Sequence, residues 1–88
     1  MPKTIYIVDD LPTNIELIEA VLKQYGDTTI KKAFNGFEFL QFLKNNPLPD
    51  LLILDLMMPI MTGFDVLIKL KEEREKNYFP VIVLSGLA

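Results

Sequence analysis

The 88-residue sequence contains no cysteine, no histidine and no tryptophan. The absence of cysteine excludes a disulfide framework and a thiolate metal site, and it is compatible with a reducing cytosol, so we expect a cytoplasmic protein. The absence of histidine removes the commonest ligand of transition metals and the usual general base. A metal bound by this chain should therefore be a hard cation held by oxygen atoms.

Positive charge and long apolar runs are also scarce. Nine basic residues stand against twelve acidic ones, which gives a net charge of −3 and argues against a nucleic-acid-binding surface. No apolar run approaches the roughly 20 residues of a membrane span, and the N-terminus, with one lysine before a strand-like run, is unlike a signal peptide. We therefore expect one small domain over residues 1–88 that binds neither nucleic acid nor membrane.

What the sequence does contain is three short apolar runs, each of which ends at an oxygen-bearing side chain. Such runs, uninterrupted by polar residues and rich in β-branched residues or leucine, are typical of strands buried on both faces of a parallel sheet. The runs and the residues that follow them are 5–8 before Asp9 and Asp10, 51–54 before Asp55, and 81–84 before Ser85. Because ligands of open α/β sheets bind outside the carboxyl ends of the strands, these side chains are predicted to share one edge of one sheet.

Helical patterns separate the strand-like runs. Apolar residues recur at steps of three and four after Pro12, after the turn signal Asn35-Gly36 and after Thr62. Residues 28–33 are β-prone but carry two charges, which predicts a short edge strand. The predicted order is therefore β-α-β-α-β-α-β, and this alternation implies right-handed crossovers and a parallel sheet.

The spacing of residues also predicts how the helices begin and which faces they bury. Thr13 and Glu16 have the spacing of a capping box for the first helix, and Thr62 is a suitable cap for the third. The second and third helices are each predicted to present one apolar face to the sheet. The residues expected in the second helix are Phe37, Leu40 and Leu43, with Phe39 and Phe42 beside them, and those in the third are Phe64, Leu67 and Ile68.

Three carboxylates at one sheet edge need a physical explanation. Adjacent acids after a strand often only cap the next helix, and an acid at a turn is often structural, so these interpretations stay open for Asp9, Asp10 and Asp55. The functional interpretation is that a divalent cation offsets their mutual repulsion, and Mg²⁺ suits a few carboxylates together with waters and phosphate oxygens. Asp55, which lies within an apolar run, then acts as a nucleophile toward phosphorus.

The chain resembles the receiver domain of bacterial two-component response regulators over essentially all 88 residues. The matching motifs are Ile7-Val8-Asp9-Asp10 with Pro12 and Asn14, Ala33-x-Asn35-Gly36, the pattern DLLILDLMMPxMxG over 50–63, and PVIVLS over 80–85. The resemblance implies a flavodoxin-like α/β/α fold whose parallel sheet has the strand order 2-1-3-4. It also implies Mg²⁺-dependent phosphoryl transfer from a histidine kinase or phosphotransfer protein, in a domain that is not a turnover enzyme.

The resemblance implies a role for each matching site residue. Asp55 matches the phosphoacceptor, and Asp9 and Asp10 match the acid pair that holds Mg²⁺. The backbone carbonyl of Met57 matches a further metal ligand, and Ser85 matches the hydroxyl that contacts the phosphoryl group during switching. The side chains of Met57 and its neighbouring methionines are expected to pack in the loop and the core, because no cysteine or histidine accompanies them.

The resemblance also has departures. Thr62 stands where the family often has aspartate, and both residues can cap a helix. The family's fourth helix, its fifth strand with a conserved lysine, and its fifth helix have no counterpart here, so we expect a receiver truncated after the fourth strand and impaired in signalling. The alternative function is a non-switching binding or assembly module. Because the run 81–84 lacks charge, bulge and proline, we expect it to self-associate into a homodimer or higher oligomer.

Overall fold

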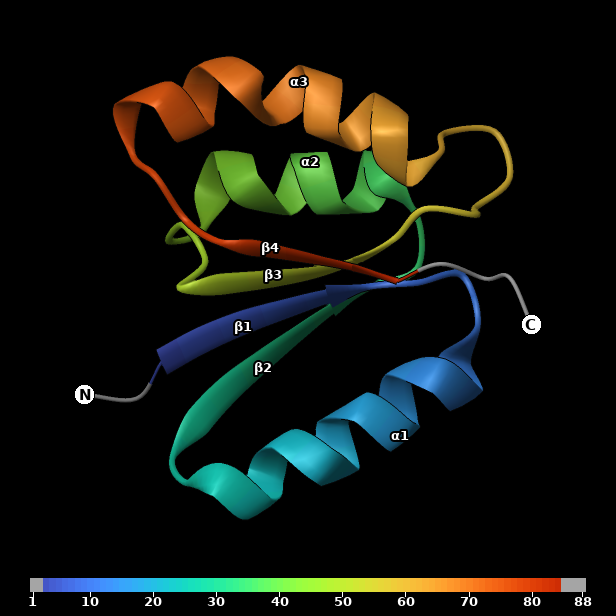
Figure 1. Ribbon diagram of the computed structural model, residues 1–88, viewed down its shortest axis with the longest axis vertical. Helices are drawn as coiled ribbons and strands as arrows, with labels where there is room; N and C mark the ends of the chain where they lie inside the picture. The colour runs from blue at the N-terminus through green and yellow to red at the C-terminus, as the bar shows by residue number, and fades with distance from the viewer. Residues whose placement is uncertain (1–2, 85–88) are drawn as a thin grey trace.

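The computed structural model describes residues 3–84, whose strands and helices form three layers (Figure 1). The strands are β1 (Lys3–Val8), β2 (Thr28–Ala33), β3 (Leu51–Asp55) and β4 (Val81–Leu84). The helices are α1 (Pro12–Leu22), α2 (Gly36–Asn45) and α3 (Gly63–Lys76), and a short 3-10 helix, Lys23–Tyr25, continues α1. None of the helices in this part of the chain is long and apolar enough to cross a membrane.

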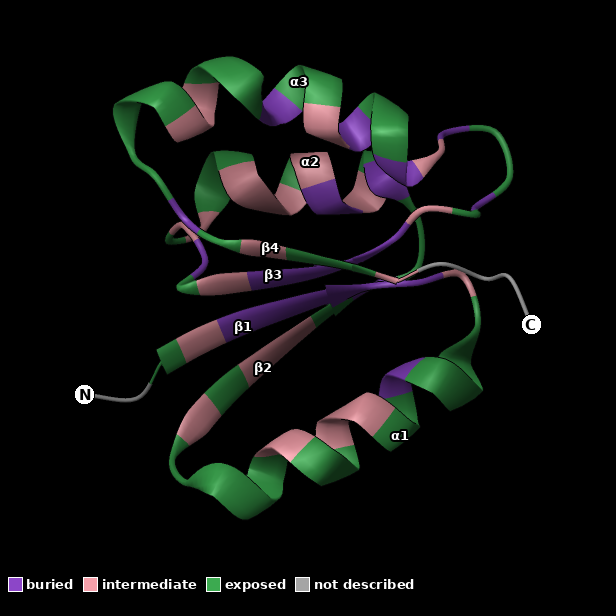
Figure 2. Ribbon diagram, viewed as in Figure 1, coloured by how far each residue is buried: buried purple, intermediate pink, exposed green. Residues whose placement is uncertain are grey.

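The four strands are parallel and lie in the order β2-β1-β3-β4. This arrangement confirms the predicted fold class, strand order and edge position of β2. Helix α1 covers one face of the sheet, and α2 and α3 lie side by side on the other (Figure 1). The central strands β1 and β3 are mostly buried, whereas β2 and β4 are more exposed (Figure 2).

Alternating residues of β1 build a core on each face of the sheet. Ile5 and Ile7 pack with Ile15 of α1 and Ile53 of β3 in the smaller core. Tyr6 and Val8 point to the opposite face and enter the larger core beneath α2 and α3. The sheet is therefore covered on both sides, as its uninterrupted apolar runs predict.

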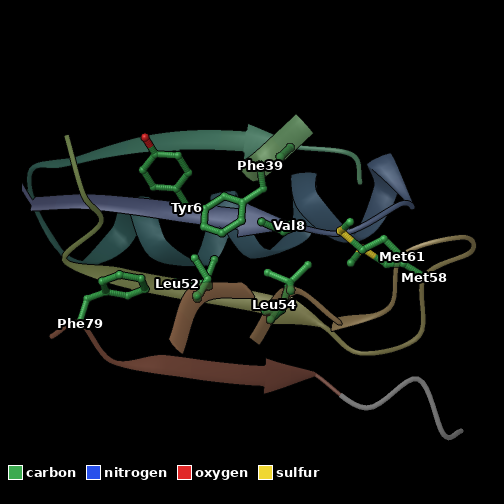
Figure 3. Close-up of a cluster of buried hydrophobic side chains, with 11 residues drawn as sticks. Tyr6, Val8, Phe39, Leu52, Leu54, Met58, Met61 and Phe79 are labelled. Atoms are coloured by element: carbon green, nitrogen blue, oxygen red, sulfur yellow. The ribbon is translucent and has the colours of Figure 1, made fainter. Parts of the chain in front are cut away.

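The larger core is organised around aromatic contacts (Figure 3). The rings of Tyr6 and Phe39 meet edge to face, with centroids 5.4 Å apart and an interplanar angle of 72°. The buried Tyr6 hydroxyl donates a hydrogen bond to the Pro47 carbonyl over 3.2 Å, so its polar atom has a partner. Met58 and Met61 also lie in this core, which confirms their predicted packing role.

The buried faces of α2 and α3 differ from those predicted. In α2 the fully buried aromatic residue is Phe39, while Phe37 is 57 % exposed. In α3 the buried positions are Gly63, Val66 and Leu70, so the predictions of Phe64 and Ile68 were wrong. Leu67 packs against the edge of the core, as do Leu40 and Leu43. The first half of α3 carries apolar residues on several sides, so its spacing did not identify the inward face.

The predicted capping box at the start of α1 was also wrong. The residue before the helix is Leu11, which has no side-chain cap bond, and Pro12 occupies the first turn, where a missing N–H is tolerated. The predicted cap of α3 is confirmed. Thr62 Oγ1 accepts a hydrogen bond from the Asp65 N–H over 3.2 Å, and Asp65 Oδ2 accepts one from the Thr62 N–H over 3.0 Å.

Candidate functional site

The ends of β1 and β3 bring three carboxylates to one edge of the sheet. Asp9 and Asp10 directly follow β1, and Asp55 is the last residue of β3. The two strands are neighbours, with Val8 of β1 in register with Leu54 of β3. Asp9, Asp10 and Asp55 each offer a carboxylate oxygen, and these oxygens lie within 4.8 Å of one another. The predicted convergence of the acids at one sheet edge is therefore present.

The three acids line a concave pocket of about 260 Å³ at this edge. The other lining residues are Leu11, Asn14, Met57 and Leu84. Larger hollows of about 610 and 530 Å³ lie along α3 and between α2 and α3, but each holds a single carboxylate in its lining. The smaller pocket is therefore the candidate functional site because it gathers three carboxylates, although it is not the largest of these hollows.

Asp9 is held by hydrogen bonds on both of its oxygens. Its side chain is buried, its Oδ1 accepts a bond from the Leu11 N–H over 3.0 Å, and its Oδ2 accepts one from the Asn14 side-chain amide over 3.2 Å. These bonds organise the turn between β1 and α1. Asp9 therefore fixes the turn that leads into α1 without capping the helix itself, and its carboxylate also lines the pocket.

Asp55 is buried in the same pocket, with 7 % of its surface exposed. Burial raises the pKa of its carboxyl group, and the nearby Asp9 and Asp10 raise the pKa further, while the hydrogen bond from the Met57 N–H opposes the rise. That N–H donates to Asp55 Oδ1 over 3.0 Å. The ionised form of Asp55 is therefore disfavoured unless positive charge enters the pocket.

The remaining predicted site residues are Met57 and Ser85. Met57 lines the pocket and its side chain is 61 % exposed, so its thioether belongs to neither core. Ser85 lies outside the described residues, but the preceding residue, Leu84, pairs with Asp55 and lines the pocket. The described part of the site thus contains Asp9, Asp10, Asp55 and Met57 together.

Asn14 is a pocket residue to which sequence reasoning assigned no role. It occurs in the motif that carried the family resemblance, and it lies five positions after Asp9. A helix that begins at Pro12 places this residue in its first turn, beside the end of β1. The helix start at Pro12 is the feature of the sequence from which Asn14 could have been identified as a neighbour of Asp9.

Comparisons with known proteins agree with this geometry. A family model described as "Response regulator receiver domain" matches residues 5–88. The chain is 33 % identical over 88 residues to the "Polar-differentiation response regulator DivK" of Brucella anthropi, covering 100 % of this chain and 70 % of that protein. It is 41 % identical over 83 residues to a "Probable cyclic di-GMP phosphodiesterase" of Vibrio cholerae serotype O1, covering 94 % of this chain but 18 % of that protein.

A solved structure extends the comparison to the fold. The response regulator protein TrrA from Thermotoga maritima, in complex with Mg(2+)-BeF, superposes with a TM-score of 0.79 at 35 % identity. The match covers 98 % of this chain and 71 % of that chain. The chain thus spans less than a fifth of the Vibrio cholerae relative, but about 70 % of DivK and of TrrA.

Proposed function

The chain belongs to the family of response regulator receiver domains, and from this premise we propose that Asp55 accepts a phosphoryl group in a Mg²⁺-dependent transfer. The observation that carries the proposal is the convergence of Asp9, Asp10 and Asp55, whose carboxylate oxygens lie within 4.8 Å of one another. Phosphoryl transfer needs positioning and charge stabilisation more than covalent chemistry from the protein. A pocket with one buried acceptor and two supporting acids meets that need.

Mg²⁺ suits the donor set of this pocket. The ligands are hard oxygens, and the buried Asp55 needs positive charge nearby in order to ionise. We assign Asp10, Asp55 and the Met57 backbone carbonyl as direct ligands, and Asp9 as a ligand through water because both of its oxygens already accept protein hydrogen bonds. The cation, when bound, offsets the repulsion between the carboxylates and the incoming phosphoryl oxygens. The choice of Mg²⁺ as the cation is supported by the similar protein TrrA, whose structure is a complex with Mg(2+)-BeF.

The reaction joins a carboxylate oxygen of Asp55 to phosphorus. As this O–P bond forms, the P–N bond to the histidine of a kinase or phosphotransfer protein breaks, and its electron pair leaves with the imidazole. Ser85 is proposed from the family resemblance as the hydroxyl that then contacts the phosphoryl group. Because the phosphoryl group stays on Asp55 until hydrolysis, the domain acts as a receiver and not as a turnover enzyme. Its proposed location is the cytoplasm, where such kinases present their phosphohistidine.

We do not propose cyclic di-GMP phosphodiesterase activity, which the name of the Vibrio cholerae relative states, for this chain. This chain matches 18 % of that protein, so the name describes a protein that is mostly unmatched here. Self-association through β4 remains a prediction. In the described residues Ile82 and Val83 of β4 are about half exposed.

Metal binding and labelling test the proposed function separately. Mn²⁺, used as a paramagnetic substitute for Mg²⁺, is expected to broaden the amide resonances of the loops after Val8 and Leu54 before all others. Acetyl phosphate with Mg²⁺ is expected to label Asp55, and Asp55→Asn to abolish the label because an amide is a poor nucleophile. Labelling is measured on the 88-residue chain and on a chimera continued with the rest of the Brucella anthropi relative. Broadening centred elsewhere, or label that persists in Asp55→Asn, contradicts the proposal.

A further inference from the structure

Gly63 is the first residue of α3 and is buried against the end of the strand that carries Asp55. Its N–H donates a hydrogen bond to the Leu56 carbonyl over 3.1 Å. A Cβ atom at position 63 would lie 2.5 Å from the Asp55 carbonyl oxygen and 2.7 Å from the Leu56 Cα. Both atoms belong to the main chain, which cannot rotate away as a side chain can. The close approach of the two backbones therefore leaves no room for a side chain at position 63.

Backbone conformation does not explain the glycine at this position. The described glycine with a positive φ is Gly26, at 117°, and Gly63 is in an ordinary helical start. Alanine is a better helix former than glycine, so a helix start with room for a Cβ gains stability from alanine. Position 63 therefore requires glycine because the start of α3 lies too close to the end of β3 for any side chain to fit between them.

The main chain of Leu56, directly after Asp55, is held from two sides. On one side the Leu56 N–H donates to the Leu84 carbonyl of β4 over 3.0 Å. On the other side the Leu56 carbonyl, which belongs to the following peptide, accepts the bond from Gly63. The Asp55 carbonyl oxygen lies 2.5 Å from the place that a Cβ at position 63 would occupy. A side chain at position 63 must push the main chain of Asp55 and Leu56, or the first turn of α3, out of place.

We propose that Gly63 is a positioning residue for Asp55, on the premise that Asp55 is the phosphoacceptor of the proposed function. The Asp55 carboxylate also accepts the Met57 N–H, so a shift of the 55–56 peptide moves this carboxylate and the Met57 main chain together. Asp9 and Asp10 follow a different strand and do not move with them. The absence of a side chain at position 63 thus sets the distance between Asp55 on one strand and the pair Asp9 and Asp10 on the other.

Gly36 offers a matched control for this proposal. It is the first residue of α2 and is buried, as Gly63 is in α3. A Cβ at position 36 would lie 2.7 Å from both Met61 Sδ and Val66 Cγ2, which are side-chain atoms. A methionine side chain can adopt another rotamer and make room. Val66 is β-branched and has less freedom to move, so Gly36→Ala presses on α3 through a side chain. Gly63→Ala instead presses on the main chain of Asp55 and Leu56.

The experiment compares Mg²⁺ and Mn²⁺ affinity in the unmodified 88-residue chain, Gly63→Ala and Gly36→Ala by calorimetric titration. Trimethylamine N-oxide is added equally to all samples to keep destabilised variants folded. We expect Gly63→Ala to lose affinity by about 10- to 100-fold, the range typical of residues that orient metal ligands. Gly36→Ala should keep the affinity of the unmodified chain even though it lowers stability in urea. The amide resonance of Met57 should shift in Gly63→Ala alone.

Two results overturn the positioning role. The first is equal affinity in Gly63→Ala and the unmodified chain, and the second is an equal loss in Gly63→Ala and Gly36→Ala. Thr62→Ala keeps the inference testable if Gly63→Ala does not fold, because it loosens the cap of α3 without adding an atom near Asp55. It should leave the affinity unchanged, and a loss there also overturns the inference. If the unmodified chain binds no Mg²⁺, the proposed function itself fails, and the inference that rests on it fails too.

Discussion

Replacing Asp55 with asparagine is predicted to raise the free energy of unfolding of the metal-free protein. The change removes one of three buried or half-buried charges while keeping the shape of the side chain. Two unit charges 4.8 Å apart repel by about 3.5 kcal/mol at an effective dielectric constant of 20. Solvent at the mouth of the pocket and salt weaken this repulsion, so we expect a gain of about 1–3 kcal/mol at pH 7.

The gain in the free energy of unfolding that Asp55→Asn brings should depend on pH, and the raised pKa of Asp55 fixes the direction of this dependence. Burial is the main cause of that rise, so the folded protein holds the proton of Asp55 more tightly than the unfolded chain does. Stability then falls as pH increases from the ordinary range of an aspartate, about pH 4, through the folded-state pKa, and is level above it. Asp55→Asn lacks this fall, so its advantage should disappear at low pH.

Mg²⁺ should reverse the order of stability. A ligand that binds only the folded state stabilises it by about 4.1 kcal/mol at a concentration one thousand times its dissociation constant, which exceeds the expected advantage of asparagine. The unmodified chain should gain this amount, whereas Asp55→Asn, which lacks a proposed ligand, should gain less. The metal-free protein is therefore predicted to favour asparagine, and the Mg²⁺-bound protein to favour aspartate.

Urea unfolding followed by far-ultraviolet circular dichroism measures both effects, with EDTA or Mg²⁺ in the buffer. Asp27→Asn is the control, because Asp27 is exposed and its replacement removes the same charge away from the pocket. Its effect should stay within about 0.5 kcal/mol, as for most surface substitutions. The reasoning is refuted if Asp55→Asn is no more stable than the unmodified chain in EDTA, or if both proteins gain equally from Mg²⁺.

Three further predictions concern single residues. Leu70→Ala, at a buried position of α3, should lower the free energy of urea unfolding by about 2–5 kcal/mol. Ile68→Ala, at an exposed position of the same helix, should lower it by less than about 0.5 kcal/mol. Equal effects would show that the buried face of α3 is assigned wrongly. Thr62→Ala should lower the free energy of unfolding by about 1 kcal/mol through loss of the cap, and no loss would show that the cap contributes nothing. Met57→Asn should speed phosphate loss from labelled Asp55, because an amide holds water beside the acyl phosphate better than a thioether does; an unchanged hydrolysis rate would contradict this.

The strands and the position of the acids could be predicted from sequence for a clear reason. A strand covered on both faces needs apolar side chains at every position, so β1 and β3 appear as uninterrupted runs that end where the sheet ends. An acid next to such a run must lie at a strand end. Parallel strands place those ends at one edge, and Asp9, Asp10 and Asp55 therefore meet there.

The rotation of α3 could not be predicted from its own residues. Phe64 and Ile68 lie one turn apart, and so do Val66 and Leu70, and both pairs satisfy helical spacing. The structure buries the second pair, because Gly36 at the start of α2 lets Val66 approach closely. That contact joins residues 30 positions apart (66 minus 36), so local periodicity carries no information about it.

The acid pocket also links the chemistry of one residue to the stability of the whole domain. Domains of this length have a free energy of unfolding of about 4–13 kcal/mol, so the repulsion worked out above is a substantial fraction of the total. Leu56, the residue after Asp55, is bonded to β4 through its N–H and to the start of α3 through its carbonyl. These are the two elements through which a change of charge at Asp55, if the proposed function holds, is expected to reach the rest of the domain. Gly63 lets the start of α3 lie directly against the main chain of Asp55 and Leu56, so α3 is in contact with the residue that carries the charge.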